Sequence, residues 1–151
     1  MIKKKTLLVR IVVIMLVFVL ACPSPVLAAT PDIATPAASY YLDAYTTYIC
    51  PIGYGDLQIW WSVVGAGTQV DLGVLRIVVY ESPDNETWTW KETFTHSDYS
   101  NMLSHNDDHH VDYVYFQGTR GYYYKAYVTI YGGNGTTGDR RFMWTPVEQA
   151  Y

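Results

Sequence analysis

The residues best suited to chemistry are concentrated in one segment, "HSDYSNMLSHNDDHHVD" at positions 96–112. It holds all four histidines of the chain and four of its aspartates. His105, Asp107 and His109 alternate, so in an extended segment their side chains would share one face. Imidazole with carboxylate suits Zn²⁺, and carboxylates alone suit Ca²⁺. We therefore treat His105, Asp107 and His109 as a candidate metal site, with a solvated polar loop between two strands as the alternative.

Neither the HExxH spacing of zinc proteases nor the spacing of an EF-hand loop is present in this segment. Histidines beside acids titrate near neutrality, so a pH-sensitive loop is a further alternative. Support for catalysis is weak elsewhere too, because the chain has no nucleophile elbow and Cys50 has no histidine close to it in sequence. We predict no catalytic residues and no cofactor. A small metal-dependent hydrolase at His105–Asp112 is kept as a third hypothesis for the function.

Aromatic residues form the second candidate surface. All 15 tyrosines lie after position 39. In "YYYKAYVTIY" (122–131) the even-numbered residues are expected in the core, which leaves every second tyrosine pointing outward. Four outward residues are the candidate ligand contacts: Trp60, Tyr123, Tyr127 and Tyr131. Tyr and Trp are enriched where proteins meet partners, whereas cross-strand aromatic pairing that only stabilises the sheet is the alternative.

Seven segments alternate apolar and polar residues, which is the pattern of half-buried strands. They are 39–50, 56–64, 73–81, 86–94, 110–116, 122–131 and 140–144. No amphipathic helical stripe interrupts them. The pattern predicts one all-β domain over 40–151, an immunoglobulin- or fibronectin-like sandwich of about seven antiparallel strands.

The stretch "YESPDNETWTW" predicts a hairpin over 74–94. Pro83 and Asp84 suit the centre of a type I turn, and Asn85 tolerates a left-handed backbone. Three aromatic residues of its second strand are expected in the core: Trp88, Trp90 and Phe94. The likeness of "SPDNETW" to the Asp-box of sialidase-type propellers is incomplete, since one residue and the glycine are missing and the motif occurs once.

The N-terminus predicts export. A basic start is followed by an uninterrupted apolar run over 11–21 and then by prolines and a Val26-x-Ala28 site. This order is typical of a secretory signal peptide. The run is also too short to span a bilayer, which takes about 20 residues.

Two kinds of processing fit this leader. Cleavage by ordinary signal peptidase would remove residues 1–28 and leave 29–39 as an exposed Ala/Thr/Pro linker before the β domain. The alternative reads "VLAC" as a lipobox, with a lipid anchor at Cys22. Either way we expect no membrane span in the mature protein and an extracellular location.

Export changes the charge of the chain. The precursor carries 14 acidic and 10 basic residues and has a net charge of −4. Loss of residues 1–28 removes four basic residues and no acid, which leaves a net charge near −8. This argues against nucleic acid and anionic lipid as partners, since both are bound through basic patches. Cys50 is then the one cysteine left, so no disulfide can form within the mature chain.

The segments "LRIVVYESPDNETWTWKETFTH", "VYFQGTRGYYYKAYVTIY" and "FMWT" carry a resemblance that extends over roughly 40–145. The chain resembles one of the small uncharacterised secreted domains (domains of unknown function) of Gram-positive, clostridia-like bacteria. The resemblance implies a β-sandwich outside the cell. It brings no catalytic residues and no activity.

These features favour a secreted, non-enzymatic module that binds a glycan or a surface protein. The contacts would come from the outward aromatic residues and from the end loops 96–109 and 132–139. The rival hypothesis is a structural protein that assembles with copies of itself at the cell surface, through the same tyrosine-rich face.

Overall fold

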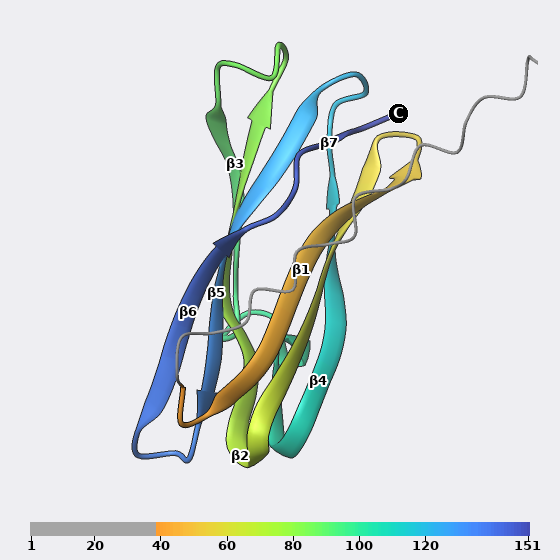
Figure 1. The fold of residues 1–151 in the computed structure, drawn as a ribbon. Coiled ribbons are helices and arrows are strands. Elements are labelled where there is room, and N and C mark those ends of the chain that lie inside the picture. Colours follow the sequence, from red (N-terminus) through yellow and green to blue (C-terminus); the bar gives the residue numbers. More distant parts are fainter. Residues whose placement is uncertain (1–38) are drawn as a thin grey trace, which may run out of the picture. The chain divides into compact units, whose positions relative to one another are not determined.

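The computed structural model describes residues 39–151, which form an all-β structure (Figure 1). Along this part of the chain the elements are β1 (Leu42–Gly53), β2 (Asp56–Ser82), β3 (Thr89–Thr95), the short 3₁₀-helix η1 (Ser100–Met102), β4 (Leu103–Gln117), β5 (Tyr123–Gly133), β6 (Gly138–Trp144) and β7 (Glu148–Gln149). The predicted signal peptide, the alternative lipid anchor at Cys22 and all of the predicted linker except Ser39 lie outside the described residues. Between residues 39 and 151, no helix has the length and apolar character needed to cross a membrane.

All strand pairs are antiparallel and belong to one sheet, with β2 at its centre. β2 pairs with β1, β3, β4 and β5, while β6 and β7 pair with β5. The first half of β2 lies between β1 and β4. Its second half lies beside β5, with β4 on the other side up to Gly73 and β3 on that side from Arg76. One strand of 27 residues therefore belongs to two differently composed halves of the sheet.

β2 joins the two halves by bending back near residues 65–69, at the base of the view in Figure 1. Gly67 adopts φ 83° there, a conformation that glycine takes without strain. The buried side-chain amide of Gln69 donates to the carbonyl oxygens of Ala66 at 3.3 Å and Gly67 at 3.0 Å. β4 turns alongside, with Asn106 at φ 55°. The sheet consequently curls into a half-barrel.

The curl brings the inner faces of the two halves together and so forms the hydrophobic core. Alternate residues of β2 and β5 supply most of it: Leu57, Ile59, Trp61, Val63, Ile77, Val79, Tyr124, Ala126, Val128 and Ile130. The inner faces predicted for 56–64 and 122–131 are therefore confirmed. Removal of this apolar surface from water contributes roughly 25 cal/mol per Å² to folding.

Polar contacts attach the start of β1 to the hairpin between β5 and β6. The hydroxyl of Ser39 donates to the carboxylate of Asp139, and the hydroxyl of Tyr41 bonds to Thr137. The bond from Ser39 lowers the pKa of Asp139; partial desolvation opposes this shift, and the backbone amide of Tyr40 adds to it. These bonds hold the start of β1 against the hairpin between β5 and β6.

The all-β class is confirmed, but the strands are divided differently from the prediction. The expected strands 56–64 and 73–81 are one continuous strand, because the glycine-containing segment between them bends without leaving the sheet. The expected loop 96–109 is shorter, since β4 already begins at Leu103. The described residues still form seven strands, because the short β7 is added. The two-sheet sandwich stays a prediction, since all seven strands share one sheet.

The predicted burial of Trp90 is wrong, and a β-bulge is the reason. Phe94 pairs with Ile77 and Trp90 pairs with Tyr80, but the register shifts between these pairs. Because Lys91 is an extra residue in β3, the side chains that precede it point to the opposite side of the sheet from the one that alternation predicts. Phe94 is 1% exposed and Trp90 is 63% exposed.

Trp88 is also outside the core, contrary to the prediction. It precedes β3, and its half-buried ring lies against Lys125 on the outer side of β5. The two tryptophans of the opening stretch are therefore surface residues, and Phe94 alone of the predicted three is buried.

The bulge predicts opposite costs for two aromatic residues only four positions apart. Phe94→Ala should lower the free energy of unfolding by about 3–5 kcal/mol, because it leaves a cavity in the core. Trp90→Ala should lower it by less than about 1 kcal/mol, because the side chain is mostly solvated. Urea unfolding of residues 39–151 measures both. Equal losses for the two variants would contradict the bulged register.

Candidate functional site

Five aromatic residues project from the outer face of the half-sheet formed by β3, the second half of β2, β5 and β6. We call this set the aromatic platform: Tyr80, Trp90, Tyr127, Phe142 and Trp144. Cross-strand pairing brings them together, because Trp90 lies opposite Tyr80, Trp144 opposite Tyr127, and Phe142 opposite Thr129. Antiparallel partners in register point to the same side of a sheet.

Four rings of the platform contact one another in a continuous group, those of Tyr80, Tyr127, Phe142 and Trp144. Tyr127 is parallel to Phe142 within 5°, with ring centres 5.9 Å apart. The ring centre of Trp144 lies 4.9 Å from that of Tyr127 and 5.6 Å from that of Tyr80. Offset and tilted pairs at such distances stabilise each other beyond simple burial. These four residues thus hold one another in place, whereas the Trp90 indole nitrogen donates to the Thr93 hydroxyl at 3.1 Å.

Lys125 joins Trp88 to this group. Its ammonium nitrogen lies 4.0 Å from the ring centre of Trp88 and 5.0 Å from that of Trp144. Both distances are within the range of cation–π attraction. A positive charge is therefore fixed among the aromatic rings.

Much of this apolar surface is open to solvent. Trp90, Phe142 and Trp144 are 63%, 57% and 48% exposed. Large aromatic side chains scattered singly on a surface need no explanation, but a contiguous group of them is typical of a binding site.

The turn before β3 positions the two tryptophans that the sequence pattern assigned to the core. The Asp84 carboxylate accepts hydrogen bonds from the Thr87 amide at 2.7 Å, the Glu86 amide at 2.9 Å and the Ser82 hydroxyl at 2.8 Å. These bonds, above all those from the two amides, hold the pKa of Asp84 far below its usual range. Asn85 has φ 62°, as its predicted left-handed tolerance requires. The predicted hairpin is confirmed.

A second aromatic group lies on the other half of the sheet. We call it the aromatic ridge: Tyr48 of β1, Trp60 of β2, and Tyr113 and Tyr115 of β4. Trp60 stacks on Tyr48 with ring centres 6.4 Å apart and lies 4.5 Å from Tyr113. The Trp60 indole nitrogen donates to Gln58 at 3.0 Å, which fixes the ring against the sheet.

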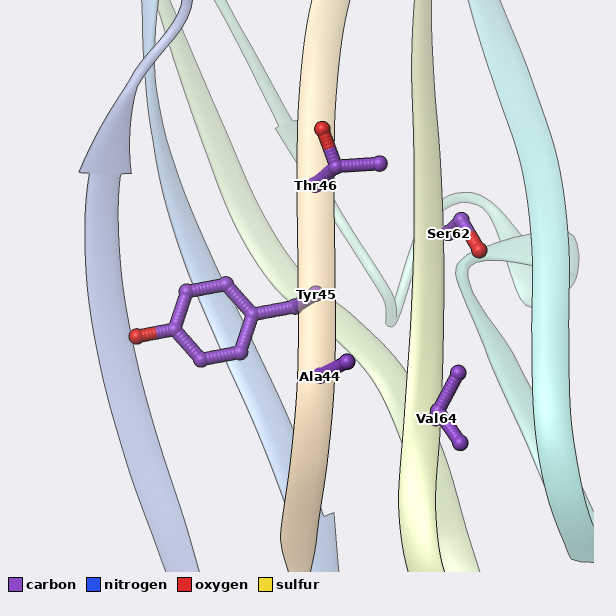
Figure 2. A pocket seen from close by; sticks show the side chains of 5 residues that line it. All are labelled: Ala44, Tyr45, Thr46, Ser62 and Val64. Atoms are coloured by element: carbon purple, nitrogen blue, oxygen red, sulfur yellow. The ribbon is translucent and has the colours of Figure 1, made fainter. Parts of the chain in front are cut away.

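A shallow hollow of about 150 Å³ lies beside the ridge (Figure 2). Small side chains of β1 and β2 line it: Ala44, Thr46, Ser62 and Val64, with Tyr45 at its margin. Figure 2 shows the Tyr45 ring pointing away from Ser62 and Val64, toward the opposite side of β1. The hydroxyl oxygen of Thr46 is buried without a hydrogen-bond partner. The hollow is too small and too open to enclose a substrate.

The four predicted ligand contacts do not form one site. Tyr127 belongs to the platform, whereas Trp60 belongs to the ridge on the other half. Tyr131 covers its own hairpin, where a Cβ on Gly138 would lie 2.6 Å from its ring. Tyr123 is half-buried and pairs with Gln149 of β7. Alternation identified these residues as outward correctly, but it carries no information about which of them are neighbours.

The sequence interpretation missed most of the platform. Trp88 and Trp90 were assigned to the core, and Phe142 and Trp144 were assigned to the last strand without a face. The signal that was available is the alternation of "RRFMW", which places Phe142 and Trp144 on one side with Arg140. The cross-strand register that brings them to Tyr127 is not written in any local pattern.

The candidate metal residues occupy the bend of β4, each with its own partner. His105 bonds to Asp71 through Nδ1 at 2.7 Å, and His109 lies 3.2 Å from the Ser62 hydroxyl. The Asp107 carboxylate accepts from the backbone amides of Asp108 and His109. Within residues 39–151 no three His, Cys, Asp or Glu side chains are grouped as metal ligands would be. The structure gives this segment a role in shaping the bend, and the metal site stays a prediction.

Comparison with known proteins adds no relative: no family model matches the chain, and no curated protein or solved structure is significantly similar to it. The site must therefore be interpreted from its own geometry.

The turn at Asp84 predicts a specific defect. Asp84→Ala should raise hydrogen exchange of the Glu86 and Thr87 amides at neutral pH, because both lose their acceptor. In the unmodified protein this contribution to stability is present above the ordinary pKa of an aspartate and is lost only as pH falls toward the much lower folded value. Exchange measured by NMR tests this. Unchanged exchange in Asp84→Ala would contradict the assigned bonds.

The separate partners of His105, Asp107 and His109 predict a weak response to metals. Addition of Zn²⁺ or Ca²⁺ to metal-free protein should leave the melting temperature unchanged, since no convergent ligand set gains from binding. A rise of several degrees that disappears in His105→Ala would show instead that the three residues bind metal together.

Proposed function

We propose that this protein is a secreted, non-enzymatic module that binds glycans outside the cell through the aromatic platform. The carrying observation is the contact of Tyr127 with both Phe142 and Trp144 on an exposed outer face. Flat aromatic groups match the apolar faces of sugar rings, which stack on them while their hydroxyl groups stay in water. Such a face has no need of a deep pocket.

The surroundings of the platform support a polar, ring-shaped ligand. Thr93, Thr95 and Thr129 lie in register among the aromatic residues on the same outer face. The Thr129 hydroxyl can donate to and accept from sugar hydroxyls, the Thr93 hydroxyl can donate while it accepts from Trp90, and the Thr95 hydroxyl can accept while it donates to Asp98. Aromatic surface beside hydroxyl groups is the composition that adaptable binding surfaces use.

The fold we propose for this module is sandwich-like, in the manner of immunoglobulin and fibronectin domains. Its two packed halves would act as the two layers, each with an outer face free for recognition. The export signal predicted at residues 1–28 supports this proposal, since it would direct the module outside the cell, where glycans are abundant. Nucleic acid and membrane lipid remain excluded in this proposal because of the acidic charge of the mature chain.

The rival proposal is a surface protein that assembles with itself or binds another extracellular protein. Exposed Trp and Tyr are also the residues that protein interfaces favour. The two proposals differ in a simple property, because self-assembly makes the molecular mass depend on concentration, whereas a glycan-binding monomer keeps one mass and shows saturable binding.

Binding of residues 29–151 to an array of cell-wall and host mucin glycans tests the proposal. We expect a specific glycan to bind, and Trp144→Ala or Tyr127→Ala to weaken it by about tenfold or more, as loss of a central aromatic contact does. Trp60→Ala is the matched control, since it removes an outward tryptophan from the ridge instead. A blank array would refute glycan binding, and loss of binding only in Trp60→Ala would move the site to the ridge.

A further inference from the structure

The charge on the platform face is opposite to that of the domain. Residues 39–151 contain 13 Asp and Glu but only six Lys and Arg. Three of those six basic residues share the outer face of the platform half-sheet: Arg76, Lys125 and Arg140. Arg76 lies opposite Thr129, Lys125 opposite Tyr80, and Arg140 opposite Tyr131, so all three point to the platform side.

One carboxylate of these strands lies on the same side, that of Asp71 at the end of the half-sheet, and it already bonds to Nδ1 of His105 at 2.7 Å. The other acidic residues of β3, β6 and the second half of β2 lie elsewhere: Glu81 pairs with Lys91 at 3.4 Å, Glu92 lies opposite the core residue Val79, and Asp139 accepts from Ser39. The nearest acid at the margin is Asp98, which accepts from the Thr95 hydroxyl at 2.6 Å. Three cations thus share one face of an acidic domain, and the Asp71 carboxylate at the end of that face is bonded to His105.

The remaining basic residues of the described chain have other positions. Lys91 is the partner of Glu81, Arg120 covers the ring of Tyr54, and the Arg141 guanidinium donates to the backbone of Arg140. By contrast, Arg76 and Arg140 are exposed, and among the residues that the structure describes neither forms an ion pair with a carboxylate. Both are therefore available to an anionic group of a ligand.

The three cations are spread along the platform. Lys125 and Arg140 lie six residue steps apart along paired strands, because Arg140 is opposite Tyr131. At about 3.3 Å per residue this separates them by roughly 20 Å. Arg76 lies between these two levels, since its partner is Thr129. The face therefore offers widely spaced positive charges along a track of aromatic rings.

We propose that the ligand of this platform is an acidic glycan, in which carboxylate or sulfate groups are spaced along a chain of sugar rings. This inference rests on the proposed function and names the class of glycan. The sugar rings stack on Tyr127, Phe142 and Trp144, and the acidic groups reach Arg76, Lys125 and Arg140. Arginine suits this task because its guanidinium binds carboxylate and sulfate through paired hydrogen bonds.

A nucleic acid fits this face less well. Duplex DNA carries one charge for about every 1.7 Å of its length and is bound through dense basic patches. Three cations over roughly 20 Å match a more sparsely charged polymer. The surplus of acidic residues elsewhere on the domain would repel a dense polyanion that extends past the platform.

The test uses two arms of ligands with matched neutral forms. One arm holds glycans with galacturonate, glucuronate or sialate, each beside its methyl ester. The other arm holds sulfated glycans, each beside its desulfated form. We expect one charged glycan to bind at about 50 mM salt, and its affinity to fall at about 300 mM salt, where the Debye length is shorter. Its neutral form should bind more weakly.

Charge-removing variants locate the contacts. Arg76→Gln and Arg140→Gln should each weaken binding of the charged glycan by about two- to fivefold, the range of a solvent-exposed ionic contact. The double variant should show roughly the product of the two effects, since the sites are far apart. Arg120→Gln is the matched control, because it removes the same charge away from the platform and should leave the affinity unchanged.

Each outcome separates the two proposals. Equal affinity for the neutral form, or no effect of Arg76→Gln and Arg140→Gln, overturns the acidic-glycan inference. The proposed glycan binding still stands in that case if Trp144→Ala abolishes the binding. Failure of every glycan, charged and neutral, overturns the proposed function together with the inference.

Discussion

The bend of β2 is the constraint on which the rest of the structure depends. Because one strand passes from the first half of the sheet to the second, the core, the ridge and the platform all take their orientation from residues 65–69. The side-chain amide of Gln69 supplies hydrogen-bond donors to two backbone carbonyl groups at the bend, those of Ala66 and Gly67. A buried amide without such partners would destabilise the fold. The bend thus combines the backbone freedom of glycine with a side chain that completes its hydrogen bonding.

The curl also determines how this domain can bind anything. Within residues 39–151 the interior is filled by side chains from both halves, and the hollows described on the domain are open ones, so we expect recognition on the outer faces. On the platform half, the exposed rings are stabilised by one another and by Lys125, which compensates in part for their contact with water. Flat faces of this kind favour long ligands that contact several residues along a strand.

Period-2 alternation predicted the all-β class and the inner faces of the longest strands, because alternation is a local property of an extended chain. It placed Ile59 and Val128 in the core correctly. It failed where the outcome depended on a partner strand: the Lys91 bulge exposes Trp90, and the register between β5 and β6 brings Trp144 to Tyr127. The same limit explains why the predicted contacts Trp60 and Tyr127 are found on different halves.

The bulge at Lys91 has a consequence for how such a surface arises during evolution. Deletion of that single residue would restore regular pairing in β3 and still leave Trp90 opposite Tyr80 on the platform, while Phe94 kept its place in the core. One extra residue in β2 opposite Lys91 would instead pair with it, and Tyr80 and Trp90 would then both turn toward the interior without any substitution. Small changes of length within this hairpin, rather than changes of residue type, are thus a direct route by which related chains could gain or lose a binding face.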